Sequence, residues 1–210
     1  MSVHQIINKA NCTHFCILFI YFLILKFVQK SYIYAFLFFK YFPQKMKILI
    51  TGTPGAGKTT LSKEIHELYK IPYIEVSSYI IQNNLYKGKS KKFDSSLFDD
   101  NVVREHFKNY LKDKNSFIID THSPSVFDFI NFDLSYVLKV STDVLYTRLR
   151  QRGYKNSKIK ENISCEIFEV IEDDLNGMKI PFYLVGDEEG YLTKDDVISQ
   201  IGKNILNKHI

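Results

Sequence analysis

The sequence predicts an α/β fold in which a doubly wound, parallel β-sheet is flanked by helices. Short apolar runs that suit buried strands alternate with segments whose apolar residues recur at helical spacing. A glycine-rich loop, residues 52–60, joins the first of these strands to the first helix. A later apolar run ends in the carboxylate of Asp120, and no internal repeat interrupts the alternation.

Strands are expected where apolar residues run together over a few positions. They are residues 47–51, 72–76, 116–120, 134–140 and 180–185. Helices are expected where an apolar stripe repeats every three or four residues. They follow Thr60, cover 101–112, run from a cap at Asp143 to Arg150, and cover 163–175 and 194–207.

Two of these helical stripes define an expected buried face. In the first helix the stripe consists of Leu61, Ile65 and Leu68. In the helix over 163–175 it consists of Ile163, Ile167, Phe168, Val170 and Ile171. Cys165 lies inside that second apolar face, so we expect it to pack rather than to react.

Two stretches lack this periodicity. Residues 77–100 are polar and contain a lysine cluster at 87–92, so we expect a mobile segment that covers a nucleotide. The lysine cluster is interpreted as a solvated loop rather than an RNA site. Residues 153–162 are also polar, and a lid hinged there would bring side chains onto a bound nucleotide.

Residues 52–60 match G-x-x-x-x-G-K-[ST], the phosphate-binding loop (P-loop) of nucleotide-handling proteins. The glycines let backbone N–H groups point at phosphate oxygens, and the following helix N-terminus favours anions. Lys58 is placed to reach the β- and γ-phosphates of ATP, and Thr59 to offer its hydroxyl to Mg²⁺. The expected nucleotide-binding residues of the loop are Gly52, Gly55, Ala56, Gly57, Lys58, Thr59 and Thr60.

A P-loop also needs a carboxylate for the magnesium shell. Asp120 closes the apolar run 117–119, which is the position of a Walker-B acid, so we expect it to hold Mg²⁺ directly or through water. His122 follows two residues later and would lie near the phosphates on the same face. Spacing alone leaves the role of this histidine open.

Phosphoryl transfer further needs cations that follow the moving charge, and arginine suits this because its planar fork holds phosphate oxygens in fixed geometry. Arg148 and Arg152 lie four residues apart at the end of a predicted helix. We expect Arg152, with Arg148 beside it, to close over the transferred group. The alternative is a solvated helix end stabilised by the helix dipole, and we favour that interpretation for Arg150.

Composition bounds the function only loosely. The chain has 210 residues, with 28 Lys and Arg against 23 Asp and Glu. Five of the lysines lie in residues 1–45, which contain no acidic residue, so residues 46–210 are formally neutral and carry no independent nucleic-acid signal. Beyond residue 45 the only cysteine is Cys165, which excludes a disulfide framework or a cysteine zinc site there.

Residues 1–45 form an apolar N-terminal extension before a nucleotide-binding domain at 46–210. The apolar run 15–25 is too short to span a bilayer, and extending it to residue 39 places Lys26 and Lys30 near its middle. We expect Met46 to be the initiator and 1–45 to be upstream sequence. The alternative is a membrane anchor, which would make the chain a membrane-anchored nucleotide-binding protein.

Residues 187–190 and 193–196 match the D-x-x-G and [NT]-K-x-D patterns of GTPases. Only two residues separate the two patterns, so they cannot grip opposite ends of one nucleotide. We interpret them as a turn and the start of a helix.

Several stretches together resemble the adenylate kinase isoenzyme 6 family, also known as the coilin-interacting nuclear ATPase. They are residues 48–60, 85–88, 120–122, 144–149, 152–154 and 161–168. The last two are much more specific than the P-loop. The similarity extends from residue 47 to the last helix and includes none of residues 1–45.

The resemblance implies an adenylate-kinase-like fold with a monophosphate-binding segment near 77–100 and a short lid near 151–162. It implies phosphoryl transfer from ATP to AMP, giving ADP, with slow ATP hydrolysis as a second activity. It also implies that Asp120 and His122 form the Walker-B pair, and that Arg152 is the lid arginine that contacts ATP. Work in the nucleus and cytoplasm on the small ribosomal subunit, with a ribosomal protein as partner, is implied as well. A monomer is expected.

One departure from the family concerns the acceptor. Relatives usually carry an arginine in the helix after the second strand, where it would meet the AMP phosphate. Residues 77–82 contain none, and Ile81 occupies the matching position. An ATPase switch in ribosome assembly, with weak or no AMP kinase activity, is therefore the alternative function.

Overall fold

The structure is a computed structural model, and it describes residues 45–90 and 95–208. The chain divides into two units, Met1–Pro43 and Gln44–Ile210, and every element described below belongs to the second. The extension expected over residues 1–45 lies outside the described residues except for Lys45. Within the described ranges, no helix is both long and apolar enough to cross a bilayer.

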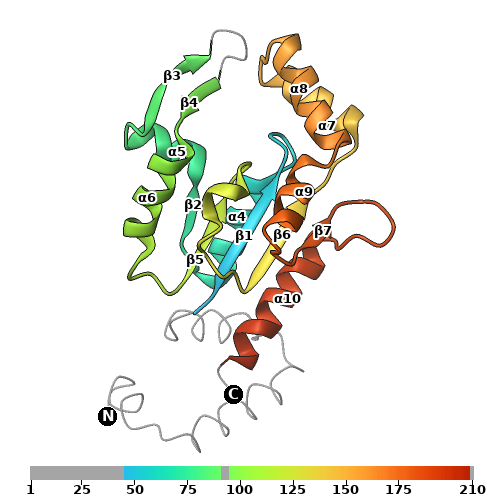
Figure 1. Ribbon diagram of the computed structural model, residues 1–210. Helices are drawn as coiled ribbons and strands as arrows, with labels where there is room; N and C mark the ends of the chain where they lie inside the picture. Colours follow the sequence, from blue (N-terminus) through green and yellow to red (C-terminus); the bar gives the residue numbers. More distant parts are fainter. Residues whose placement is uncertain (1–44, 91–94, 209–210) are drawn as a thin grey trace, which may run out of the picture. The chain divides into compact units, whose positions relative to one another are not determined.

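Five parallel strands form the central sheet, in the order β2-β5-β1-β6-β7 (Figure 1). The strands are β1 (Lys47–Gly52), β2 (Tyr73–Glu75), β5 (Phe117–Asp120), β6 (Leu134–Leu138) and β7 (Tyr183–Val185). Strand β1 lies between β5 and β6, and buried residues run along all three because both faces of a parallel sheet are covered. The predicted α/β fold class is confirmed.

Helices cover both faces of this sheet. They are α4 (Lys58–Tyr69), α5 (Val76–Gln82), α6 (Asp100–Leu111), the 3₁₀ helix η2 (Pro124–Phe127), α7 (Thr142–Gln151), α8 (Asn156–Ile167), α9 (Val170–Gly177) and α10 (Lys194–Asn207). The predicted bounds of α10 are confirmed, and Thr193 begins it with a capping box to Asp196.

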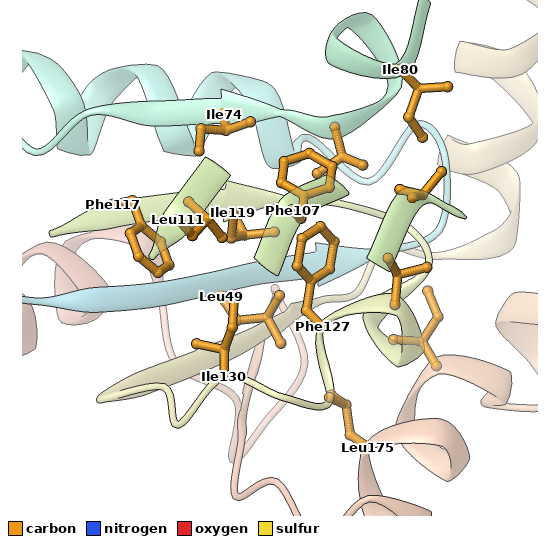
Figure 2. Close-up of a cluster of buried hydrophobic side chains, with 14 of the residues drawn as sticks. Leu49, Ile74, Ile80, Phe107, Leu111, Phe117, Ile119, Phe127, Ile130 and Leu175 are labelled. Carbon is orange, nitrogen blue, oxygen red and sulfur yellow. The ribbon is translucent and has the colours of Figure 1, made fainter. Parts of the chain in front are cut away.

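One face of the sheet packs against α6, η2 and α9 (Figure 2). Leu49 of β1 lies there beside Phe107 and Phe127, whose rings meet edge to face with centroids 5.0 Å apart. Burial of each such side chain contributes about 2–3 kcal/mol to stability. This cluster fixes the sheet beneath the P-loop.

An antiparallel hairpin stands apart from the central sheet. It consists of β3 (Tyr86–Ser90) and β4 (Ser95–Phe98). The hairpin and α8 lie on opposite sides of the P-loop end of the sheet (Figure 1). Periodicity did not predict this hairpin within 77–100. Part of the lysine cluster, residues 91 and 92, lies outside the described residues.

The single helix expected over 163–175 is wrong in two respects. Helix α8 begins at Asn156, inside the stretch expected to be aperiodic, and ends at Ile167. Glu169 then takes a left-handed conformation (φ 50°), so α9 starts in a new direction. As a result Ile167, Phe168 and Val170 are exposed rather than on one buried face.

Two further boundary predictions need correction. Leu68 is exposed, so only Leu61 and Ile65 of the first helical stripe are buried. Helix α7 is capped by Ser141, whose side chain accepts from the Val144 N–H, and not by Asp143. Both side chains can cap, and the structure uses the one placed before the first helical turn.

The end of β1 requires glycine. Gly52 has φ +141° and pairs with Leu138 of β6, and a Cβ there would lie 2.5 Å from the Leu138 carbonyl oxygen. We expect Gly52→Ala to lower the free energy of unfolding by more than about 2 kcal/mol, because backbone strain and a backbone clash add. Urea unfolding measures this.

The control for that substitution is Gly177→Ala. Gly177 ends α9, and a Cβ there meets nothing within 4 Å. It is expected to leave stability unchanged or slightly raised. Equal stability losses in both variants would contradict the close packing of Gly52 on β6.

Candidate functional site

The P-loop wraps around the carboxyl end of β1 and leads directly into α4. Gly55 and Gly57 both have left-handed φ values, +103° and +105°. Lys58 folds back over the loop, where its Nζ donates to the carbonyl oxygens of Gly52 at 2.8 Å and Thr53 at 3.2 Å. The ammonium is thereby held at the place where phosphates are expected.

Burial lowers the pKa of Lys58. Lys58 is only 8 % exposed, and desolvation lowers its pKa to about 8, against the partial compensation from the charge of Asp120. A nearby anion such as a phosphate would favour the charged form. The site therefore places a buried ammonium that gains from a negatively charged ligand.

This pKa shift predicts a pH-dependent stability. In the folded protein Lys58 loses its proton near pH 8, whereas in the unfolded chain it does so near 10.5. Between these values the unfolded state binds more protons, so the contribution of Lys58 to stability rises with pH. The free energy of unfolding of the wild type, minus that of Lys58→Met, should increase by up to about 3 kcal/mol from pH 8 to 10.5. A flat difference in urea unfolding would contradict the shift.

A carboxylate and a hydroxyl meet beside Lys58. Strand pairing places Asp120 opposite Ile50 of β1, and the Thr59 Oγ1 donates to the Asp120 Oδ2 at 2.7 Å. Burial raises the pKa of Asp120, which is 3 % exposed, although the Thr59 hydrogen bond and the Lys58 charge act in the opposite direction. Two hard oxygen donors in contact fit Mg²⁺.

The small number of protein oxygen donors also fits Mg²⁺. In the described part of the chain, no three His, Cys, Asp or Glu residues gather into a metal cluster. Mg²⁺ usually takes one or two protein oxygens and completes its shell with water and substrate phosphates. Thr59 and Asp120 would hold it here, as the sequence predicts.

A second carboxylate, which the sequence analysis missed, lies at the same edge of the sheet. Glu75 ends β2 and pairs in register with Asp120 of β5. It lines the same cavity, and its charge contributes to the raised pKa of Asp120. Only the strand order β2-β5-β1 reveals this proximity, since the two residues are far apart in sequence.

The first of two cavities opens over these residues and has a volume of about 590 Å³. One end is polar and includes the P-loop, Asp120, His122 and Arg152. The other end is mostly apolar and is formed by α5, β4, α6 and η2. Its apolar lining residues are Val76, Ile80, Ile81, Phe98, Val103 and Val126.

The second cavity, of about 720 Å³, lies on the other side of the P-loop. It is bounded by the ends of β6 and β7, by α7 and by the first residues of α10. Arg148 lines it and donates from its guanidinium to the Gly55 carbonyl oxygen at 3.0 Å. The two cavities share Gly55, Gly57, Thr60 and Arg152.

His122 lies in the first cavity near Lys58. Its pKa is lowered to about 4, chiefly because surrounding protein disfavours the charged ring and secondarily through the charges of Lys58 and Lys158. The residue is nonetheless exposed to solvent where it lines the cavity. At neutral pH the imidazole is therefore uncharged and can act as a hydrogen-bonding group.

The structure brings most of the predicted site residues together. Lys58, Thr59, Asp120, His122 and Arg152 all line the first cavity. Ala56 and Arg148 line only the second. Gly52 lines neither cavity and instead supplies a carbonyl acceptor for Lys58. Their catalytic roles stay predictions.

Residues 187–196, which contain the two GTPase-like patterns, do not form a GTPase-like site. Asp196 accepts hydrogen bonds from the Thr193 backbone and hydroxyl, so its carboxylate is used in the helix cap. Asp187, Thr193 and Asp195 nonetheless line the second cavity. The two-residue spacing still excludes a GTPase-like grip on one nucleotide, but the fold brings this segment beside the P-loop, which the sequence did not predict.

Comparison with known proteins decides the family. Residues 48–169 match the family described as AAA domain. A Caenorhabditis elegans protein named adenylate kinase isoenzyme 6 homolog is 35% identical over 132 residues, which cover 62% of this chain and 72% of the relative. This chain belongs to the adenylate kinase isoenzyme 6 family. The corresponding homolog of Saccharomyces cerevisiae is 31% identical over 157 residues, covering 74% of this chain and 78% of the relative.

A solved structure supports the fold of this adenylate kinase isoenzyme 6 relative. Shikimate kinase from Acinetobacter baumannii aligns with a TM-score of 0.54 over 81% of this chain and 98% of that chain, at 12% identity. Such a likeness shows a P-loop kinase fold and nothing about substrate. The family, and not this likeness, makes the protein a nucleotide-binding kinase.

Proposed function

We propose that the protein transfers a phosphoryl group from ATP to AMP, with slower ATP hydrolysis as a second activity. The observation that carries this proposal is the pair of cavities that meet at the P-loop and share Gly55, Gly57, Thr60 and Arg152. Both volumes lie in the range of small-molecule sites. A donor and an acceptor nucleotide need such a pair, with the transferred group at the junction.

The donor nucleoside is assigned to the second cavity, and its phosphates run along the P-loop to Lys58. The acceptor is assigned to the first cavity, between α5 and α8. In this arrangement the γ-phosphate lies beside Lys58, Thr59 and Asp120, which are in contact or in charge interaction with one another. The names of the relatives, adenylate kinase isoenzyme 6 homologs, support adenine nucleotides as substrates.

Catalysis in this proposal consists of positioning and charge neutralisation, with no covalent intermediate. Bound Mg²⁺ would neutralise developing negative charge on the phosphates. The P-loop N–H groups and Lys58 hold the donor phosphates, and Arg152 follows the transferred group from the end of α7. The neutral His122 orients the acceptor or a water molecule.

The acceptor end of the first cavity carries an unusual set of side chains. Ile81 of α5, where relatives are expected to have arginine, is 54% exposed and lines the cavity. Among the residues that the structure describes, the lysines and arginines that line this cavity are Lys58 of the P-loop, Arg152 at the end of α7 and Lys158 of α8. We expect weak AMP affinity, since a lysine holds phosphate as a looser point charge than arginine does.

The test is to incubate the full chain with ATP and Mg²⁺, with and without AMP, and to measure ADP and inorganic phosphate. AMP-dependent formation of ADP, at two per AMP consumed, supports the proposal. Phosphate release that does not depend on AMP, with no AMP consumed, contradicts it.

That contradicting result is the one expected from the second candidate function, an ATPase switch. The missing arginine of α5 favours it, because an acceptor phosphate without a bidentate partner is held loosely. The family resemblance extends this candidate to small-ribosomal-subunit assembly in the nucleus and cytoplasm. Addition of AMP should then leave the rate of phosphate release unchanged.

A further inference from the structure

A polar cluster of buried and half-buried residues adjoins the P-loop through Thr53. Its members are Thr53, Lys139, Glu166 and Glu172, from the P-loop, the end of β6, α8 and α9. Lys139 forms ion pairs with Glu166 at 3.4 Å and with Glu172 at 2.5 Å. The Thr53 hydroxyl donates to the Glu166 Oε2.

The cluster has two carboxylates for one ammonium. Both glutamates are only 7 % exposed, and the Glu166 Oε1 has no hydrogen-bond partner and contacts a cation only through its 3.4 Å ion pair with Lys139. Buried ions seldom raise stability over an apolar core of the same shape, because desolvation cancels their attraction. A role in placing other groups explains this cluster better than stability does.

The two glutamates differ in their relation to the P-loop. They are equally buried and pair with the same lysine, but only Glu166 contacts the P-loop. Glu166 also acts on the phosphate site at a distance, since its negative charge helps to raise the pKa of Lys58 against desolvation. Neither glutamate lines either cavity, so the contact with Thr53 is what distinguishes Glu166.

We propose that Glu166 is a positioning residue of the phosphate site, whose carboxylate holds Thr53 and thereby fixes the P-loop relative to α8. Helix α8 carries Lys158, Glu161, Asn162 and Cys165 into the first cavity, and Glu166 follows immediately. The hydrogen bond to Thr53 therefore links the loop that binds phosphate to the helix that covers it. Only this last step, the assignment of α8 to covering an acceptor, rests on the proposed function.

The test compares matched variants of the full chain. Glu166→Gln and Glu172→Gln each remove one buried charge from the same lysine with little change of shape. Thr53→Val removes the donor hydroxyl, and Thr53→Ser keeps it. The readouts are the Kd for ADP by calorimetry, which needs no acceptor or turnover, and the melting temperature.

Glu166→Gln and Thr53→Val are expected to weaken ADP binding about tenfold, the size of one lost charge-assisted hydrogen bond. The Kd for ADP of Glu172→Gln and of Thr53→Ser should stay within about twofold of the wild-type value. The melting temperatures of the two glutamine variants should fall by similar amounts. The double variant of Thr53→Val and Glu166→Gln should bind no more weakly than either single variant.

Equal weakening by Glu166→Gln and Glu172→Gln would overturn the proposal, as would wild-type ADP binding by Thr53→Val. Wild-type protein that binds no ADP would overturn both this proposal and the kinase function. ADP binding with the expected variant pattern, but no transfer to AMP, would sustain the positioning role and contradict only the proposed acceptor.

Discussion

Replacing Lys58 with alanine is expected to lower kcat/KM for ATP by about 10²- to 10³-fold, the usual loss when one preorganised donor to a transition state is removed. Lys58 is buried, and its ammonium is held by the carbonyl oxygens of Gly52 and Thr53. Because its ammonium is partly desolvated, its attraction for phosphate exceeds that of an exposed lysine. Steady-state ATP turnover measures the effect.

The matched control is Lys63→Ala. Lys63 lies on the same helix, α4, but is exposed and lines neither cavity. It removes the same formal charge and should change kcat/KM by less than about twofold. Full turnover by Lys58→Ala would refute the arrangement of the phosphate site.

The second large effect is expected for Asp120→Asn. Loss of the carboxylate that faces Thr59 should reduce kcat by about 10²-fold or more and raise the Mg²⁺ concentration needed for half-maximal rate. The free energy of unfolding, in contrast, should rise or stay unchanged. The raised pKa of Asp120 means that the fold disfavours its charged form, so a neutral amide of the same shape removes a cost.

Asp133→Asn is the control for that substitution. Asp133 precedes β6 at the opposite edge of the sheet, where it accepts from the Lys47 N–H at 2.7 Å and pairs with Lys208 at 2.5 Å. The Asp133→Asn protein should have a lower free energy of unfolding and an unchanged dependence of its rate on Mg²⁺. An Asp120→Asn protein with unchanged magnesium dependence would remove Asp120 from the proposed metal site.

The sequence predicted the parts of the site that are local. The P-loop, the strand before it and the helix after it are contiguous, so their residue types and spacing define one structure. Asp120 could be placed because a strand that ends in a carboxylate has few alternatives beside a P-loop. The helix expected over 101–112 is confirmed as α6, whose buried residues Val103, Phe107 and Leu111 recur at helical spacing.

Features that depend on tertiary contacts escaped prediction. Glu166 meets Thr53 across 113 positions of sequence, and a glutamate on a helix is ordinarily solvated. The break between α8 and α9 depends on the left-handed backbone of Glu169. Glycine usually takes this conformation at the end of a helix, so a glutamate there gave no signal in the sequence. Glu75 joins the site only through the order of the strands.

The placement of the arginines shows the same limit. Spacing put Arg148 and Arg152 on one helix face, and both do line the second cavity. Only Arg152 also reaches the first, because α7 ends at Gln151 and Arg152 lies at its C-terminal cap. Arg148 instead donates to the P-loop backbone. A helical wheel gives a direction for a side chain but no information on what surrounds it.

In the proposed arrangement, one P-loop serves two cavities, one for a donor nucleotide and one for an acceptor. Binding of diadenosine pentaphosphate, which joins two adenosines through a chain of phosphates, tests it most directly by calorimetry. We predict that one molecule binds per chain, about tenfold or more tightly than ATP, and that it displaces both ATP and AMP. Binding no tighter than that of ATP, with AMP binding left unchanged, would contradict the claim.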